Sequence, residues 1–237
     1  MSDHQGNKIG IGYRDGTSRY TQSAQAGPAY LMLADAPADD PVDHCFVSIP
    51  DGITPVAQGD WLTMTVGPAT IAVRGVGAQA AVGVAELAEK QQKDNEQRVA
   101  KGQEPRHKPA PIIRIPGRRV GFVVEVLDTT DAAAVAAALQ KTQLDAGRLA
   151  ADRSVTYTTT AGRRIEMTMD PSAGDDAHAD RMAKVTLDGE PVTLDGWPIA
   201  SGPYVRQAPG VLTVNDGREG FEVDFTGERP VYRAWKP

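Results

Sequence analysis

His44 is the residue of this sequence whose type and neighbours best fit proton transfer. It follows Asp43 directly and precedes the apolar run Cys45-Phe46-Val47. A histidine beside a carboxylate can act as a general base, because its ordinary pKa lies near neutrality. A lone histidine is also commonly a hydrogen-bonded structural residue, so both interpretations stay open. The sequence therefore offers one candidate catalytic residue and does not reveal its partners.

The sequence contains no metal-ligand spacing. Its single cysteine, Cys45, stands near no suitably placed histidine, and one cysteine cannot form an intramolecular disulfide. The acidic stretch 170–180 carries oxygen ligands that could hold calcium, but it does not match an EF-hand loop, and a solvated acidic loop is the alternative. We therefore expect no cofactor and no metal site, with calcium at this stretch left open. The sequence has four histidines, and none stands at a metal-ligand spacing from another or from Cys45: they are His4, His44, His107 and His178.

Aromatic side chains form a second group of candidates. A flat ring can stack on the apolar face of a sugar, while neighbouring polar groups fix the orientation of the sugar. Trp197 lies in the turn sequence Asp195-Gly196-Trp197-Pro198, which favours an exposed ring. The same rings can equally fill a β-sandwich core, because only 5% of the residues are aromatic. The candidate glycan-binding residues are Trp61, Trp197, Tyr204 and Arg206.

The charge balance limits the kinds of partner. A formal net charge of -6 disfavours a general nucleic-acid binder. Local basic patches stay open, and the alternative is solvated strand ends; the candidates are Arg114, Arg118 and Arg119, with Arg163 and Arg164 elsewhere. No apolar stretch is long enough to span a membrane. The first ten residues lack the basic and then apolar pattern of a signal peptide. We therefore expect a cytoplasmic location by default, unless the chain is part of a longer exported protein.

The elements that must position these residues are mostly predicted strands. Residues 61–66 and 69–73 predict a hairpin around Gly67-Pro68, and the nearly continuous apolar run 119–126 predicts a central strand. Asp131 is the expected cap of an alanine-rich helix. After residue 153 only strands are expected. The segments concerned are 155–158, 164–169, 185–187, 192–194, 211–214, 221–225 and 231–235.

The spacing of these strands indicates the fold class. Many short strands separated by turn residues are typical of a sandwich and not of a βαβ fold. We expect a mainly β protein, an antiparallel β-sandwich (supersandwich-like) with one or two short helices, forming a single body over residues 1–237. Residues 1–58 are expected as loop-rich strands at its edge. Residues 80–110 are rich in charge and are expected as a helical or mobile excursion.

Several segments also follow one another in a familiar order. Within residues 40–225 they are Gly59-Asp60-Trp61, 69–73, 117–125, the short alanine-rich helix, 155–157 with Gly162 and Ile165, 188–191 and 197–205. In order and texture the chain resembles the C-terminal β-sandwich domain of polysaccharide lyases of the heparinase II/III type and of related glycan-active proteins. In that family a helical toroid is joined to the sandwich.

The resemblance implies a role beside a catalytic part. In such lyases the toroid supplies most catalytic residues, and the sandwich packs against it and can lend a His or Tyr. This sequence contains no toroid, so the implied function is a non-catalytic accessory module that packs on a catalytic toroid domain or chain, or contacts a polysaccharide. Its alternatives are a polysaccharide lyase active only with a partner chain, with His44 as the catalytic residue carried over, and a structural interaction protein.

Overall fold

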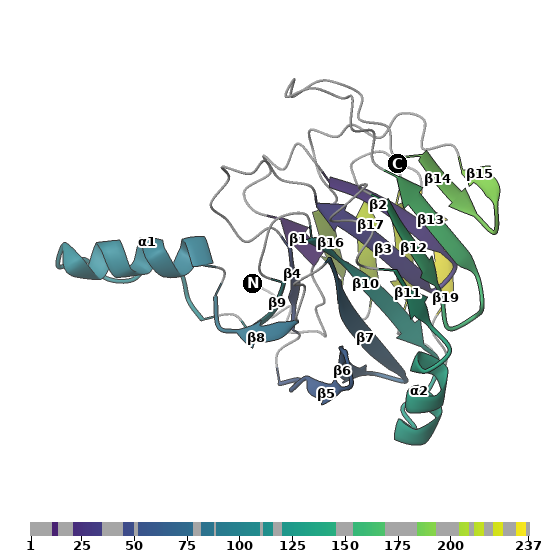
Figure 1. Ribbon diagram of the computed structural model, residues 1–237. Helices are drawn as coiled ribbons and strands as arrows, with labels where there is room; N and C mark the ends of the chain where they lie inside the picture. The colour runs from purple at the N-terminus through teal and green to yellow at the C-terminus, as the bar shows by residue number, and fades with distance from the viewer. Residues whose placement is uncertain are drawn as a thin grey trace.

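The protein is described by a computed structural model, which covers residues 11–13, 21–34, 45–49, 52–77, 82–87, 89–109, 111–115, 120–145, 154–168, 184–192, 204–208, 211–215, 220–224 and 231–235. Within these ranges the chain forms strands β1 to β19 and helices α1 and α2 (Figure 1). The strands pair in antiparallel sheets. The predicted mainly β, antiparallel fold with one or two short helices is therefore confirmed, and the described helices are two.

A six-stranded sheet forms the centre of the body. Its strand β10 lies between β3 and β7, which confirms the central position predicted from its apolar sequence. Phe122 and Val124 are buried on one face of β10, and Val123 and Leu127 are buried on the other. Burial on both faces explains the nearly continuous apolar run. In order across the sheet the strands are β2 (Thr21–Ala26), β3 (Ala29–Ala34), β10 (Val120–Leu127), β7 (Ala69–Val76), β6 (Trp61–Val66) and β5 (Val56–Gln58).

The β6–β7 hairpin forms as the sequence predicts. Val66 pairs with Ala69 across the turn, and Gly67 has a φ of 56°, a conformation that favours glycine. Strand β7 continues to Val76, three residues beyond the predicted end at Val73. The extension gives β7 seven paired positions along β10, so the two strands are joined over nearly their full length.

A five-stranded sheet packs against one face of the central sheet. Buried and half-buried or exposed side chains alternate along its strands β12 and β13. Tyr157 and Ile165 are buried, whereas their neighbours Thr156 and Glu166 are half-buried on the opposite face. Such alternation marks a sheet with one face on the core. Its strands, in order, are β11 (Gln143–Leu144), β12 (Ser154–Thr158), β13 (Arg164–Thr168), β14 (Lys184–Leu187) and β15 (Glu190–Val192). The predicted strand pairs are thereby confirmed for the described residues.

Helix α2 (Ala132–Leu139) closes the core shared by these two sheets (Figure 1). Asp131 caps it as predicted, because its Oδ1 accepts a hydrogen bond of 2.7 Å from the Ala134 amide. Val135 and Leu139 are buried in one cluster with Leu31 and Val123 of the central sheet and with side chains of β12, β13 and β14. The two sheets therefore pack face to face through one hydrophobic core, as a sandwich requires.

Two four-stranded antiparallel sheets complete the described structure. The first contains β1 (Ile11–Tyr13), β4 (Cys45–Ser48), β9 (Ile112–Ile115) and β8 (Gly83–Ala85), and its strands β4 and β9 approach β10 of the central sheet. Val47 and Ile113 are fully buried there. The second contains β16 (Tyr204–Ala208), β17 (Val211–Asn215), β18 (Gly220–Asp224) and β19 (Val231–Trp235).

The strands of the first 58 residues lie both at the edges and inside the sheets, and the excursion at 80–110 contains a helix. Strands β1, β2 and β5 stand at sheet edges, whereas β3 and β4 lie between other strands. The excursion contains helix α1 (Glu89–Ala100), which extends away from the sheets in Figure 1. No helix of the described residues is long and apolar enough to cross a membrane.

Candidate functional site

The residues predicted to do chemistry are only partly within the described structure. His44, Trp197 and the acidic stretch 170–180 lie outside the described residues, so their proposed roles stay predictions. Tyr204 and Arg206 stand two positions apart in β16, where they pair with Asn215 and Thr213 of β17. Their roles in glycan binding also stay predictions.

Trp61 has a defined environment. Its side chain is only 5% exposed and belongs to the core cluster between the two packed sheets. Of the two interpretations that the sequence leaves open, the core interpretation describes this residue. Its ring is not available to stack on a sugar while the core is closed.

The structure instead reveals a buried polar cluster that the sequence does not single out. Glu125 on β10 is 0% exposed, and its carboxylate accepts hydrogen bonds from three groups. The Thr160 amide donates to Oε1 over 2.9 Å, and the Thr160 hydroxyl donates to Oε2 over 2.8 Å. The Tyr157 hydroxyl also donates to Oε1. Because Tyr157 and Thr160 belong to β12 and the turn after it, these bonds join the two sheets.

The turn after β12 positions Thr160 for this contact. The Thr159 amide donates to the carbonyl of Arg163 over 2.8 Å, and the Gly162 amide donates back to the Thr159 carbonyl over 2.8 Å. The Thr159 side chain, 1% exposed, accepts a hydrogen bond from the Arg163 amide. Gly162 has a φ of 77°, which closes the turn in a conformation that glycine adopts without strain. This tight turn holds both donors of Thr160 against Glu125.

Burial controls the protonation of the two ionisable groups in the cluster. It raises the pKa of Glu125, and the hydrogen bonds from Tyr157 and Thr160 oppose this only in part. The pKa of Tyr157 is raised by burial first and then by the neighbouring Glu125 charge and hydrogen bond. The positive charge of Arg74 and a hydrogen bond with Thr142 act in the opposite direction on Tyr157. Burial therefore raises the pKa of both groups above their ordinary values.

Glu125 in β10 is the one residue whose sequence context could have indicated this cluster. Glu125 is a carboxylic acid within the apolar run Gly121-Phe122-Val123-Val124-Glu125-Val126. A charged residue in a strand buried on both faces requires hydrogen-bond partners, because an unpaired buried carboxylate is very costly. The sequence thus indicates that partners exist. It does not indicate which residues they are.

The outer face of the five-stranded sheet is polar, and the arginines Arg163 and Arg164 near it are paired with acidic side chains. Thr156, Glu166 and Thr186 lie in one cross-strand row. The guanidinium of Arg164 contacts the Glu166 carboxylate at 3.1 Å, and Arg163 pairs with Asp188. The pKa of Asp188 is lowered, first by a hydrogen bond from the Arg164 amide and then by Arg163. The two arginines therefore do not form an uncompensated basic patch.

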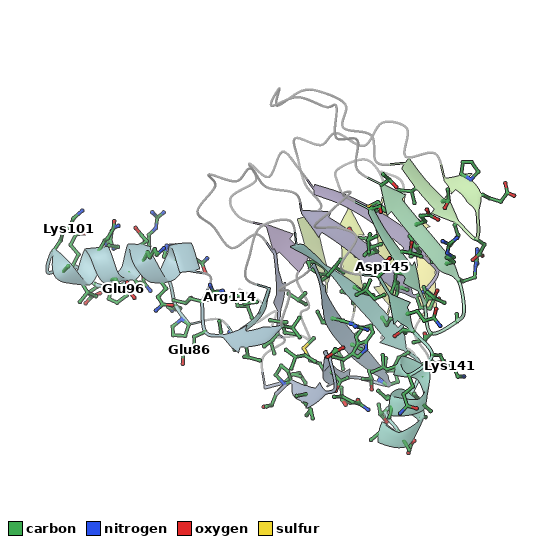
Figure 2. All side chains as sticks on the ribbon, in the orientation of Figure 1. Glu86, Glu96, Lys101, Arg114, Lys141 and Asp145 are labelled. Atoms are coloured by element: carbon green, nitrogen blue, oxygen red, sulfur yellow. The ribbon has the colours of Figure 1, made fainter. Side chains whose placement is uncertain are left out.

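Helix α1 and the segment after it form a self-contained arm. The side chain of Asn95 accepts hydrogen bonds of 2.9 Å from the amides of Arg106 and His107, and donates to the His107 carbonyl over 2.8 Å. His107 Nε2 also lies 3.0 Å from Asp94 Oδ2. Glu96 and Lys101 lie along the arm, away from the sheets (Figure 2). The charged excursion is thus a helix with its return segment tied back onto it.

Among the described residues, no group of three or more His, Cys, Asp or Glu side chains could hold a metal ion. No family model, curated protein or solved structure matches the chain. The resemblance to the sandwich of heparinase II/III-type lyases therefore stays a prediction.

Proposed function

We propose that the chain is a non-catalytic β-sandwich module that accompanies a carbohydrate-active, polysaccharide lyase-like enzyme. It would pack on a catalytic toroid domain or chain, or contact the polysaccharide itself. Two things support this proposal: the order of the segments that resemble the C-terminal lyase sandwich, and the antiparallel two-sheet body around one core.

The observation that carries the non-catalytic part is the closure of the Glu125 cluster. A general acid or base must come within hydrogen-bond reach of the substrate or of one bridging water. Glu125 is 0% exposed, and three donors from the neighbouring sheet and turn surround its carboxylate. This buried acid of the described part of the chain is therefore used inside the protein and not at a cleft.

The Asp43-His44 pair supports one alternative function, which the experiment must distinguish from the proposed one. Asp43-His44 has the residue types of a proton-transfer pair, so a lyase that becomes active only with a partner chain would use His44. Such an enzyme would produce an unsaturated uronate. The proposed module binds without turnover.

Affinity electrophoresis through gels that contain neutral or uronate-rich polysaccharides tests the proposal, while the absorbance of unsaturated uronate is recorded in the same mixtures. We expect retardation by one polymer and no absorbance rise. The variants Tyr204→Ala and Arg206→Ala should no longer be retarded by the polysaccharide. Thr186→Ala, on the outer face of the five-stranded sheet, should still be retarded. Far-UV circular dichroism establishes that each variant is folded.

Each other outcome changes the conclusion. An absorbance rise that disappears in His44→Ala would overturn the non-catalytic proposal in favour of the lyase. If no polysaccharide slows the migration of the chain and the absorbance of unsaturated uronate does not rise, the proposal that the chain contacts glycan directly is wrong. If the chain also failed to bind a toroid-containing lyase in a pull-down, the structural interaction protein would remain.

A further inference from the structure

Glu125 is the only acidic side chain among the buried residues of the described ranges. The strand positions directly opposite it in the central sheet are Ala29 on β3 and Ala72 on β7, neither of which carries charge. The charged group nearest in register on this face is Arg74 of β7, which pairs with Asp60 at 3.1 Å. Every hydrogen bond shown for the Glu125 carboxylate comes from the other sheet and its turn. The carboxyl group thus connects the two layers inside an otherwise apolar core.

We propose that the Glu125–Tyr157–Thr160 cluster is a proton-dependent latch, whose release opens the sandwich at the turn between β12 and β13. This inference concerns the fold and does not depend on the proposed function. The Thr160 hydroxyl donates to Oε2 of an ionised Glu125 over 2.8 Å; in the closed form that we propose, Oε2 carries a proton, so this hydrogen bond is reversed and Oε2 donates to Thr160 Oγ1, while Tyr157 and the Thr160 amide still donate to Oε1. The carboxyl group is then neutral and fully hydrogen-bonded, which suits its apolar surroundings.

Release begins when the proton of Glu125 moves to water. A carboxylate then remains in a site that excludes solvent and holds no cation hydrogen-bonded to it among the described residues, so hydration becomes favourable. The tip of the turn offers the shortest route for water, because Ala161, Gly162 and Arg163 are exposed. Movement of this tip breaks both bonds from Thr160 and admits water to Glu125.

The rest of the neighbourhood is expected to stay closed during this step. Tyr157 keeps its proton, because its pKa is raised above the ordinary value of 10.0. Its ring remains in the core with Val155 and Ile165. The opening is therefore local to residues 159–163 and the facing end of β10, and it differs from global unfolding.

Hydrogen–deuterium exchange of the intact chain between pH 5 and pH 9 tests the latch. After correction for the intrinsic exchange rate, peptides that contain Thr160 should show an opening equilibrium constant that rises with pH, by at most about tenfold per pH unit, between the ordinary carboxyl pKa of 4.5 and the raised pKa of Glu125, and that levels off above the raised pKa. Peptides covering β6 and β7 should show no such rise. Equal behaviour of all these peptides, or no rise in any of them, overturns the proposal.

Two variants separate the latch from a general effect of pH. Glu125→Gln cannot ionise and should abolish the rise, whereas Glu166→Gln, on the outward face of β13, should retain it. A rise that persists unchanged in Glu125→Gln would also overturn the proposal. If Glu125→Gln does not fold, Thr160→Val serves instead, because loss of the hydroxyl that fixes Oε2 should move the rise to a different pH. An unmoved rise in this variant again counts against the latch.

Discussion

Tyr157 of the five-stranded sheet donates its hydroxyl hydrogen to Glu125 of the six-stranded sheet, inside the core that the two sheets share. The two residues are 0% exposed and come from strands that are neighbours neither in sequence nor in a sheet. The bond therefore links the two layers by a polar contact in addition to apolar packing.

Removal of this hydroxyl should weaken the protein. Tyr157→Phe leaves the ring in place but takes one donor from a buried carboxyl group, so we expect a loss of about 1–3 kcal/mol in the free energy of unfolding. Urea denaturation measures it. Thr156→Val, an outward-facing position on the same strand, should change stability by less than about 0.5 kcal/mol. Equal losses in both variants would contradict the assigned role of Tyr157.

Stability should fall as the solution becomes more alkaline. The folded-state pKa of Glu125 lies above its ordinary value of 4.5, so its contribution is complete below pH 4.5 and is lost as the pH rises through the raised pKa. The slope from this one group reaches at most about 1.4 kcal/mol per pH unit. Tyr157, also raised, adds a further loss above pH 10. Urea denaturation of Glu125→Gln across the same pH range should show a flatter profile, and an identical profile would contradict the assignment.

The cap of α2 should contribute measurable stability. Asp131→Ala removes the acceptor for the Ala134 amide, and we expect a loss of about 1 kcal/mol. Because Val135 and Leu139 anchor the helix in the shared core, thermal unfolding of the whole body should report this loss. Asp128→Ala, at an exposed acid in the same connection, is the control and should have little effect.

The arm should loosen without any change in the body. Asn95→Ala removes the hydrogen bonds that hold Arg106 and His107 against α1. We expect trypsin to cleave after Arg106 about tenfold faster, which corresponds to roughly 1.4 kcal/mol of lost hydrogen bonding. Gln92→Ala, which removes only a bond to Glu96 within the helix, should be cleaved at the original rate. A matching decrease in the melting temperature of the body would show that the arm is not independent.

The turn that carries Thr160 should require its glycine. Gly162 has a φ of 77°, so Gly162→Ala forces an L-residue into the left-handed region at a cost of about 1–2 kcal/mol. No atom of a more distant residue lies within 4 Å of the added methyl group, so the cost comes from the local backbone conformation and not from a clash with the surrounding structure. Gly83→Ala, equally unobstructed and with no left-handed φ, should cost less in the same denaturation assay.

Several elements of the fold could be predicted from local sequence because their signals are local. The apolar run of β10 indicates burial on both faces, and Asp131 before a run of alanines indicates a capped helix. The Asp188-Gly189 turn follows from two residues that tolerate left-handed backbone, with φ of 53° and 88°. In each case the deciding information lies within a few neighbouring residues.

The candidate site could not be predicted in the same way. Glu125 and Thr160 are 35 positions apart in the chain, and their contact depends on how two sheets stack. The place of Trp61 could not be predicted from the sequence either, because a tryptophan suits both a core and a binding surface. Only the packing of β6 against the five-stranded sheet shows that Trp61 lies in the core. The ties between Asn95 and residues 106–107 join a side chain to backbone amides, which hydrophobic periodicity does not register.

The β8–β9 pair gives the arm a practical consequence for protein engineering. Ala85 and Ile112 are directly paired, so the two ends of the excursion are held at the separation of neighbouring antiparallel strands, about 5 Å. A tight turn should therefore be able to replace residues 86–111 and leave the sheets joined. By the same geometry, a fluorescent reporter or an affinity tag with adjacent termini should be tolerated at this position, which makes the arm a natural grafting point.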